Sequence, residues 1–233
     1  MSAIAIVTGA ARGIGLAIAQ RLARDGFTVV ATDRDVDKLS SEDVDAIAMD
    51  VTDRAAVSAV MRRVGPVTVV VNNAGVGAPM VPFDKLTRAE LRGIIEINTK
   101  GTFIVAQEAV RDMPAGGRII NIASRGYLGG AGAGHYVASK AAVVGLTRAL
   151  AVELRWRGIN VNAVAPGMVD TPMISDFTAQ EMSALLKREP SGKAASPASI
   201  ADVVSFLASP SAAAINGQVI FADGGKTVGM PTL

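Results

Sequence analysis

Tyr136 and Lys140 place a phenol and an ammonium group four residues apart at the start of a long apolar run without proline. If this run is a helix, residues i and i+4 share one face, so the two side chains lie close together. A free tyrosine has a pKa of about 10 and exchanges protons poorly at neutral pH. A neighbouring cation favours the phenolate and lowers that pKa. The pair therefore suits general acid–base chemistry on an alcohol or a carbonyl group, although many surface helices carry the same spacing.

A glycine-rich turn near the start of the chain could hold a nucleotide. An apolar run over residues 3–7 leads into this turn, and a helical pattern follows over residues 16–23. The turn contains Gly9, Gly13 and Gly15. Such a turn allows close backbone approach to a pyrophosphate, which then rests on the helix N-terminus. The spacing G-x-x-x-G-x-G departs from the general fingerprint G-x-G-x-x-G, so a plain strand-to-helix connection stays open.

Strand and helix patterns alternate along the whole chain. After the first strand, apolar runs predict further strands over residues 27–32, 45–49, 68–71, 117–122, 159–165 and 218–221. Strands that alternate with helices indicate a parallel sheet covered on both faces. The sequence thus predicts one α/β domain over residues 1–233, built as a doubly wound Rossmann-type sheet of about seven strands.

Polar residues follow several predicted strands and should meet at one edge of the sheet, where such folds bind ligands. Asp33 ends the second strand, about 20 residues past the glycine turn, where a carboxylate can accept hydrogen bonds from an adenosine ribose. It would repel a 2′-phosphate and so favours NAD over NADP. Arg12 and Arg34 favour the opposite, because either can bind a phosphate; we give Asp33 more weight. The residues at strand ends are Gly9, Asp33, Asp50 and Asn72.

Two long helices are expected in the middle of the chain, between predicted strands. A capping box, Thr87-x-x-Glu90, opens a helix that runs to Met113. Asn98 lies in a stretch of poor helix formers, which predicts a local distortion. The second helix, Tyr136–Arg157, is apolar nearly all round and so buries more than one face. We expect a homo-oligomer, a dimer or a tetramer, that packs through Thr87–Met113 and Tyr136–Arg157.

The segment 168–193 combines two short helix-like pieces with prolines and apolar side chains. It is predicted to cover the strand ends and the substrate. Its apolar content favours a small or medium apolar alcohol or ketone. The apolar residues are Met168, Met173, Ile174, Phe177 and Met182.

Composition narrows the possible functions. The chain has 233 residues, a formal net charge of +2, no cysteine and one histidine. No metal site of cysteine or histidine ligands is expected, and scattered charge predicts no nucleic-acid partner. Neither a secretory signal nor an apolar run long enough for a membrane span is evident. We expect a cytoplasmic protein without a membrane partner.

Taken together, the motifs resemble the short-chain dehydrogenase/reductase family. The likeness extends from about Ala3 to Gly225, and it includes the glycine spacing that this family uses. The motifs occur in the family's order: Thr8-Gly9-x-x-x-Gly13-Ile14-Gly15, Asp50, Asn72-Asn73-Ala74-Gly75, Asn98, Ser124, Tyr136-x-x-x-Lys140, Pro166-Gly167 and Thr171.

This resemblance implies roles for four catalytic residues. Tyr136 would be the general acid–base, and Lys140 would lower its pKa and bind the nicotinamide ribose. Ser124 would hydrogen-bond the substrate oxygen, and Asn98 would hold a water that links Lys140 to solvent. Hydride transfer to a ketone builds negative charge on oxygen, so donors aimed at that oxygen stabilise the transition state.

The resemblance also implies the cofactor contacts. Asp50 would meet the adenine, Asn72 and Gly75 would pack near the adenine-side ribose, and Thr171 would help to hold the nicotinamide carboxamide. The full set is Gly9, Arg12, Gly13, Ile14, Gly15, Asp33, Asp50, Val51, Asn72, Ala74, Gly75, Tyr136, Lys140, Pro166, Gly167, Val169 and Thr171. Arg125, next to the catalytic serine, either contacts an acidic or polar substrate group or is a surface loop residue.

Several functions remain open at this point. The leading one is an NAD(H)-dependent oxidoreductase for a secondary alcohol or ketone. One alternative is a 3-oxoacyl thioester reductase. Another is a non-catalytic NAD(P)-binding sensor, which would be free to lose the Tyr136–Lys140 pair. A sugar-nucleotide epimerase normally needs a larger substrate domain.

Overall fold

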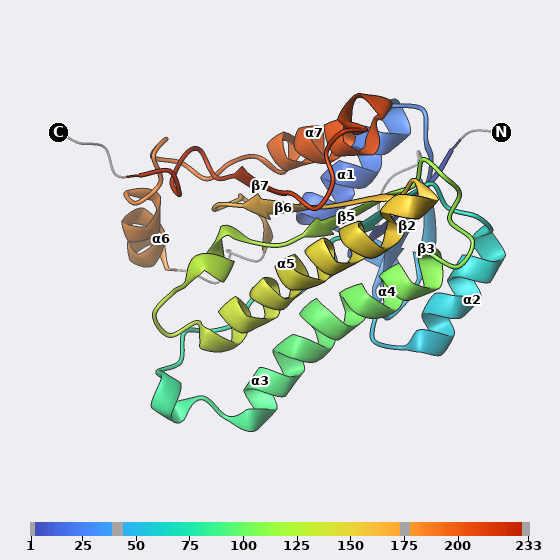
Figure 1. Ribbon diagram of the computed structural model, residues 1–233. Coiled ribbons are helices and arrows are strands. Elements are labelled where there is room, and N and C mark those ends of the chain that lie inside the picture. Colours follow the sequence, from blue (N-terminus) through green and yellow to red (C-terminus); the bar gives the residue numbers. More distant parts are fainter. Residues whose placement is uncertain (1–2, 39–43, 173–177, 230–233) are drawn as a thin grey trace.

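A seven-stranded parallel sheet lies at the centre of the protein (Figure 1). In the computed structural model, which describes residues 3–38, 44–172 and 178–229, the strand order is β3-β2-β1-β4-β5-β6-β7. Every strand pair is parallel. The order reverses between β1 and β4, which opens a ligand-binding crevice at their carboxyl ends. The strands are β1 (Ile4–Thr8), β2 (Thr28–Asp33), β3 (Asp45–Ala48), β4 (Val69–Asn72), β5 (Arg118–Ile122), β6 (Asn160–Pro166) and β7 (Val219–Ala222).

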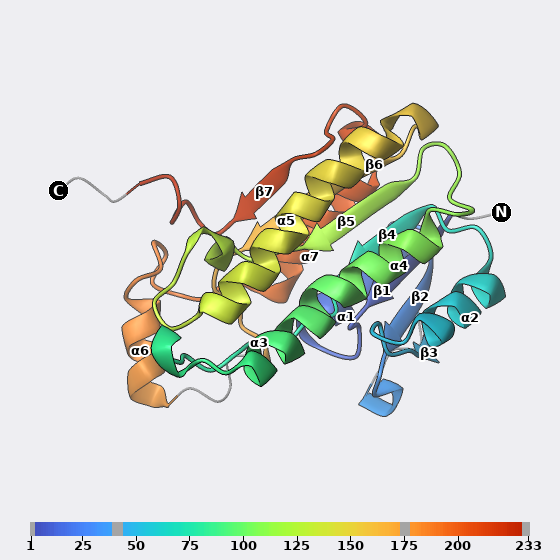
Figure 2. The same cartoon turned by 60° about the horizontal axis from the view of Figure 1, so that its bottom comes forward.

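Helices cover both faces of the sheet, as Figure 2 shows, so the predicted fold class is confirmed. Helices α1 (Gly13–Arg24) and α7 (Pro197–Ala208) pack on one face around Ile18, Leu22 and Val204. The other face carries α2 (Arg54–Val64), α4 (Thr102–Ala109) and α5 (Gly134–Leu154). Because the central strands are buried on both faces, they are continuous runs of Val, Ile and Ala.

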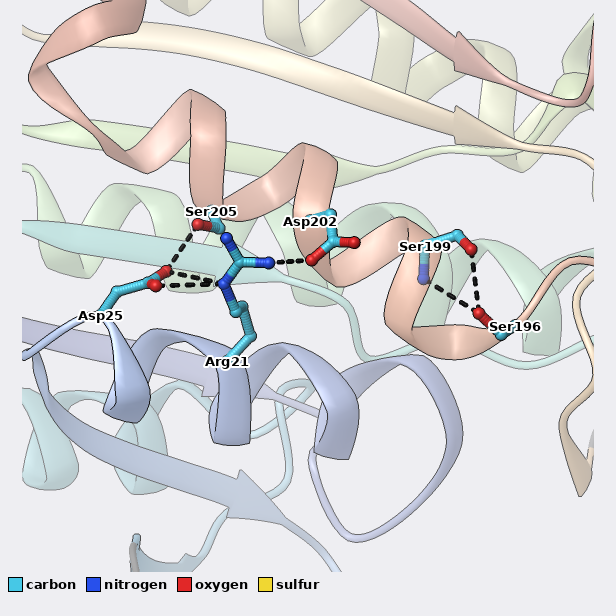
Figure 3. Close-up of polar contacts among 6 residues, drawn as sticks. All are labelled: Arg21, Asp25, Ser196, Ser199, Asp202 and Ser205. Carbon is cyan, nitrogen blue, oxygen red and sulfur yellow. Dashed lines mark hydrogen bonds and ion pairs between the residues drawn. The ribbon is translucent and has the colours of Figure 1, made fainter.

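A polar cluster joins α1 to α7 (Figure 3). The Arg21 guanidinium donates to Asp25 at 3.0 Å and forms an ion pair with Asp202. The Ser205 hydroxyl donates to Asp25 at 2.5 Å. Ser196 accepts a backbone N–H and caps the start of α7. The contacts of Arg21 and Asp25 thus connect α1, which follows the glycine turn, to α7.

The helix predicted from Thr87 begins as expected, and the predicted distortion is confirmed. Thr87 and Glu90 form a reciprocal capping box at the start of α3 (Arg88–Ile95). A π-helical segment, Glu96–Gly101, then separates α3 from α4. Such a segment adds a residue to a turn and is frequent at functional sites. Asn98 lies in this segment and is fully buried.

The predicted cover segment is described only in part. Val169 forms an isolated bridge with Ala195, and the Asp170 N–H donates to the Ala195 carbonyl at 2.9 Å. Helix α6 (Ala179–Leu186) follows Thr178, which caps it. Of the two helix-like pieces that the sequence predicts, α6 is the one in the described residues. Met173, Ile174 and Phe177 lie outside them.

Elsewhere the element boundaries agree with the sequence to within a few residues. Helix α5 continues as a single 3₁₀ turn, Arg155–Arg157, and Gly158 ends it with a left-handed φ of 69°. Within the described ranges, no helix combines the length and the apolar character that crossing a bilayer requires.

Candidate active site

A cavity of about 600 Å³ opens at the carboxyl edge of the sheet, beside the point where the strand order reverses. This volume lies within the usual range for small-ligand sites. Ten of the predicted cofactor contacts line it: Gly9, Arg12, Gly13, Ile14, Asp33, Asp50, Val51, Ala74, Gly75 and Thr171. The topology therefore brings residues from five separate motifs to one site.

The glycine turn can approach a cofactor phosphate closely, because its glycines carry no side chains and the backbone turns sharply there. Gly9 and Gly13 have φ values of 65° and 58°, a region that favours glycine. A Cβ on Gly15 would lie 2.2 Å from the Gly9 carbonyl oxygen. Asn73 stabilises the turn, since its side-chain amide donates to the carbonyls of Thr8 and Gly9, each at 2.9 Å.

Asp33 stands at the end of β2 and is fixed by backbone donors. Its carboxylate accepts the N–H of Ala11 at 3.1 Å and the N–H of Asp35 at 3.3 Å. Arg34 lies beside it and is exposed. Burial raises the pKa of Asp50, but hydrogen bonds from Thr52 and the charge of Arg34 outweigh this effect, so the Asp50 pKa lies below its usual value. The lowered pKa keeps the Asp50 carboxylate an anion at neutral pH.

Tyr136 lies in the first turn of α5, and its hydroxyl is hydrogen-bonded to Ser124 at the end of β5. The Ser124 hydroxyl also accepts the Gly126 N–H at 3.1 Å. Burial raises the pKa of Tyr136, and the hydrogen bond with Ser124 lowers it by less. The expected lowering of this pKa by Lys140 is therefore wrong for the chain alone, because desolvation of the phenolate is the larger effect.

Lys140 lies one turn further along α5 and is only 5% exposed. Its ammonium group donates to the Ile122 carbonyl at 2.9 Å. Burial lowers the pKa of Lys140 to about 8. A Cβ on Gly75 would lie 3.4 Å from the Lys140 Nζ, so Lys140 reaches the wall of the cavity.

Asn98 connects the π-helical segment to this wall. Its Oδ1 accepts the Val76 N–H at 2.8 Å, and its Nδ2 donates to the Val76 carbonyl at 3.0 Å and to the Ser139 hydroxyl at 3.1 Å. The side chain thus fixes the segment that follows Gly75 and the helix turn that carries Lys140. The predicted role of Asn98 in holding a water stays a prediction.

Residues 9–227 match a family model described as enoyl-(acyl carrier protein) reductase, which spans nearly the whole chain. The chain belongs to the short-chain dehydrogenase/reductase family. The predicted resemblance is thereby confirmed, and the protein is an oxidoreductase of a family that transfers hydride with NAD(P).

Similar proteins span the same length. The chain is 39% identical to cis-4-hydroxycyclohexanecarboxylate dehydrogenase of Sinomonas cyclohexanicum, over 96% of each chain. It is 41% identical to the 3-oxoacyl-[acyl-carrier-protein] reductase MabA of Mycobacterium tuberculosis, over 96% of this chain and 92% of that one. The solved structure of a short-chain dehydrogenase from Burkholderia cenocepacia in complex with NADP is similar, with a TM-score of 0.88 and 34% identity. The likeness covers 95% of this chain and 96% of that one.

Five predicted cofactor contacts outside the catalytic group do not line the cavity. Asn72 is buried, and its amide donates to the Asn121 Oδ1 at 2.9 Å, because the two residues are register partners in the sheet. Its neighbour Asn73 takes the predicted place. The other residues that do not line the cavity are Gly15, Pro166, Gly167 and Val169.

Other lining residues were missed, and all of them except Asp35 are apolar or glycine and carry no distinctive chemistry in the sequence. They are Ala11, Asp35, Met49, Val76, Gly77, Ile97 and Pro172.

Proposed function

We propose that this short-chain dehydrogenase/reductase is an NAD(H)-preferring secondary alcohol dehydrogenase or ketone reductase in which Tyr136 is the general acid–base. One observation supports this most directly: the Ser124 and Tyr136 hydroxyls are hydrogen-bonded to each other. Lys140, one turn along α5 from Tyr136, reaches the cavity wall at Gly75. A carbonyl oxygen that replaces this mutual hydrogen bond would receive two donors.

The residues that line the cavity would hold the cofactor, with the glycine turn toward its phosphates and Asp33 toward a ribose diol. A bound nicotinamide cofactor supplies or accepts the hydride. Ser124 would stabilise the negative charge that develops on the substrate oxygen. Tyr136 would give that oxygen a proton in reduction and take one in oxidation.

The raised pKa of Tyr136 favours the protonated phenol at neutral pH. Tyr136 would therefore be ready to donate in the reductive direction. In oxidation it must first lose this proton, so we expect oxidation to be favoured at alkaline pH.

The preference for NAD rests on the charges of the cavity. Three carboxylates line it (Asp33, Asp35 and Asp50), against two guanidinium groups (Arg12 and Arg34). A 2′-phosphate near Asp33 would meet like charge. The similar Burkholderia protein binds NADP, so a direct comparison of the two cofactors is needed.

The catalytic role is tested with Tyr136→Phe, with Trp156→Phe as the control because Trp156 is 83% exposed and does not line the cavity. Loss of a general acid costs about 10²–10⁴-fold in turnover. We expect this loss in kcat for Tyr136→Phe on a ketone panel, with unchanged cofactor affinity by calorimetry. Full turnover by Tyr136→Phe would refute the mechanism.

The cofactor preference is tested with Asp33→Ser, with Asp112→Ser as the control because Asp112 is exposed and outside the cavity. Removing a like charge near a phosphate is worth about 1–4 kcal/mol, or about 5- to 800-fold. The ratio of kcat/KM for NADH over NADPH should fall by that factor in Asp33→Ser alone. A wild-type preference for NADPH would overturn this part of the proposal.

We further propose that α4 and α5, which lie side by side in Figure 2, pack against a second copy of the chain. Their outward faces expose Phe103 (43%) and Val152 (59%) among small residues. In the predicted cover segment 168–193, residues such as Met182 would lie over the substrate. Light scattering that finds a monomer would contradict the oligomer.

A 3-oxoacyl thioester reductase is a second candidate, favoured by the identity to MabA. Turnover of a 3-oxoacyl thioester in preference to every simple ketone would select it. A non-catalytic sensor would turn over neither substrate class.

A further inference from the structure

Three segments meet through one buried carboxylate beside the catalytic serine. Glu189 follows α6 and is 9% exposed. Its Oε1 lies 2.5 Å from the Lys226 Nζ, which belongs to the segment after β7. The same oxygen lies 3.9 Å from the Arg125 Nη2. Arg125 directly follows Ser124 and begins the 3₁₀ turn Arg125–Leu128, so the cluster adjoins the reacting oxygen's position.

The charges in this cluster do not balance. Two cations share one carboxylate, and the short contact goes to Lys226. Asp223, the other acidic residue near Lys226, uses both oxygens on backbone donors, the N–H groups of Gly225 and Thr227. It contributes no hydrogen bond to either cation within the described chain. These contacts leave a net positive charge on a cluster that includes Arg125, the residue after Ser124 in the chain.

The Arg125 guanidinium donates no hydrogen bond to any of the residues that the structure describes, and its side chain is partly accessible. Its contact with Glu189 is too long for a hydrogen bond, and its side chain is 32% exposed. A guanidinium group presents a planar fork that matches a carboxylate. Gly126, the next residue, lies against both Ser124 and the Tyr136 ring, since a Cβ there would be 3.2 Å and 3.4 Å from them. The turn that carries Arg125 thus forms part of the wall around the catalytic hydroxyls.

We infer that Arg125, supported by the Lys226–Glu189 pair, binds a carboxylate of the substrate, so that the substrate is a short oxo acid or hydroxy acid. This inference rests on the proposed function, because it takes Ser124 and Tyr136 as the groups that meet the substrate's oxygen. Glu189 forms its short contact with Lys226, and its longer contact with Arg125 leaves the Arg125 N–H groups able to donate to a ligand. The substrate carboxylate would take the place of the missing second anion.

The test measures binding and needs no turnover. Cyclohexanecarboxylate and cyclohexanecarboxamide share one ring and differ in charge. Each is titrated by calorimetry into the NADH-loaded protein. We expect the wild type to bind the acid more tightly than the amide. Arg125→Ala should weaken the binding of the acid by about 10- to 100-fold, as for loss of a charged hydrogen bond, and leave the binding of the amide unchanged. Arg125→Lys should restore part of the affinity.

A second variant has the opposite expected sign. Glu189→Gln keeps the size of the side chain and removes the anion that shares the two cations. The affinity for the acid should then rise. If Glu189 only stabilised the fold of segment 168–193, its substitution would lower the affinity for both probes. Arg62→Ala is the matched control, because Arg62 is exposed on α2 and is not part of the cluster.

Any of three results overturns the inference: the wild type binds the two probes with equal affinity, the acid does not bind, or Arg125→Ala lowers the affinity for both probes equally. Failure of the proposed function is seen separately, as absent ketone turnover in a protein that still binds the acid through Arg125.

Discussion

Asn98→Ala should lower stability and activity together, and the structure gives a magnitude for each. The amide of Asn98 makes three buried or half-buried hydrogen bonds, two of them with the backbone of Val76. Truncation leaves the Val76 N–H and carbonyl without partners. Ser139 is less affected, because its hydroxyl still donates to the Tyr136 carbonyl at 2.8 Å.

An unsatisfied buried group costs about 1–3 kcal/mol. Val76 is half-buried, so water can partly replace the lost partner. The lower end of this range therefore applies to the Val76 N–H and to the Val76 carbonyl. The free energy of unfolding should therefore fall by about 2–3 kcal/mol. For a chain of this size, that corresponds to a Tm lower by about 4–12 °C.

The effect on activity follows from position. Val76 and its neighbour Gly75 line the cavity, and Lys140 lies against Gly75. Displacement of this wall by a fraction of an ångström or more should lower kcat/KM by about 10- to 100-fold. Thermal unfolding and ketone reduction, followed by the absorbance of NADH, measure the two effects on the same preparation.

Asn216→Ala is the matched control. Asn216 accepts the Val161 N–H at 2.8 Å and donates to the Ala151 carbonyl at 3.2 Å, and it does not line the cavity. Its truncation should destabilise the protein by a similar amount and leave kcat/KM at the wild-type value. If Asn98→Ala lost stability but kept wild-type kcat/KM and cofactor affinity, the reasoning about the cavity wall would be refuted.

Two further predictions concern the glycine turn and Lys140. Gly15→Ala puts a Cβ 2.2 Å from a backbone oxygen of the turn and should cost about 1–3 kcal/mol or more, with loss of the stabilisation by NADH in thermal unfolding. Gly93→Ala, which meets nothing within 4 Å in α3, should stabilise the protein by about 0.5–1 kcal/mol instead; a stable Gly15→Ala that still binds NADH would contradict the packing argument. Reductive kcat/KM should fall as pH rises through about 8, because Lys140 is charged below its lowered pKa and neutral above it. Lys140→Met should lack this limb of the pH profile, and a limb that persists in the variant would assign it to another group.

Much of the fold follows from local patterns in the sequence. Alternating apolar runs and helical periods located all seven strands, and turn glycines marked where β1 and α5 end. The Thr87 capping box was predictable because its hydrogen bonds join residues three apart. The distortion near Asn98 was predictable because poor helix formers gather there.

The candidate site was predictable as a set of residue types in order. Motif order and parallel topology together place strand ends at one edge, which is why ten expected contacts line one cavity. Which asparagine of Asn72-Asn73 supports the glycine turn depended on the register between β4 and β5, and the order of motifs does not encode that register.

The sequence by itself determined the fold class and the family, because these depend on residue identity and spacing along the chain. Only the tertiary structure decided the sign of the Tyr136 pKa shift, since it depends on how much water the surrounding segments exclude. The structure also decided that Arg125 shares Glu189 with Lys226. Those three residues come from distant parts of the chain, and their charges act through distances that exist only after folding.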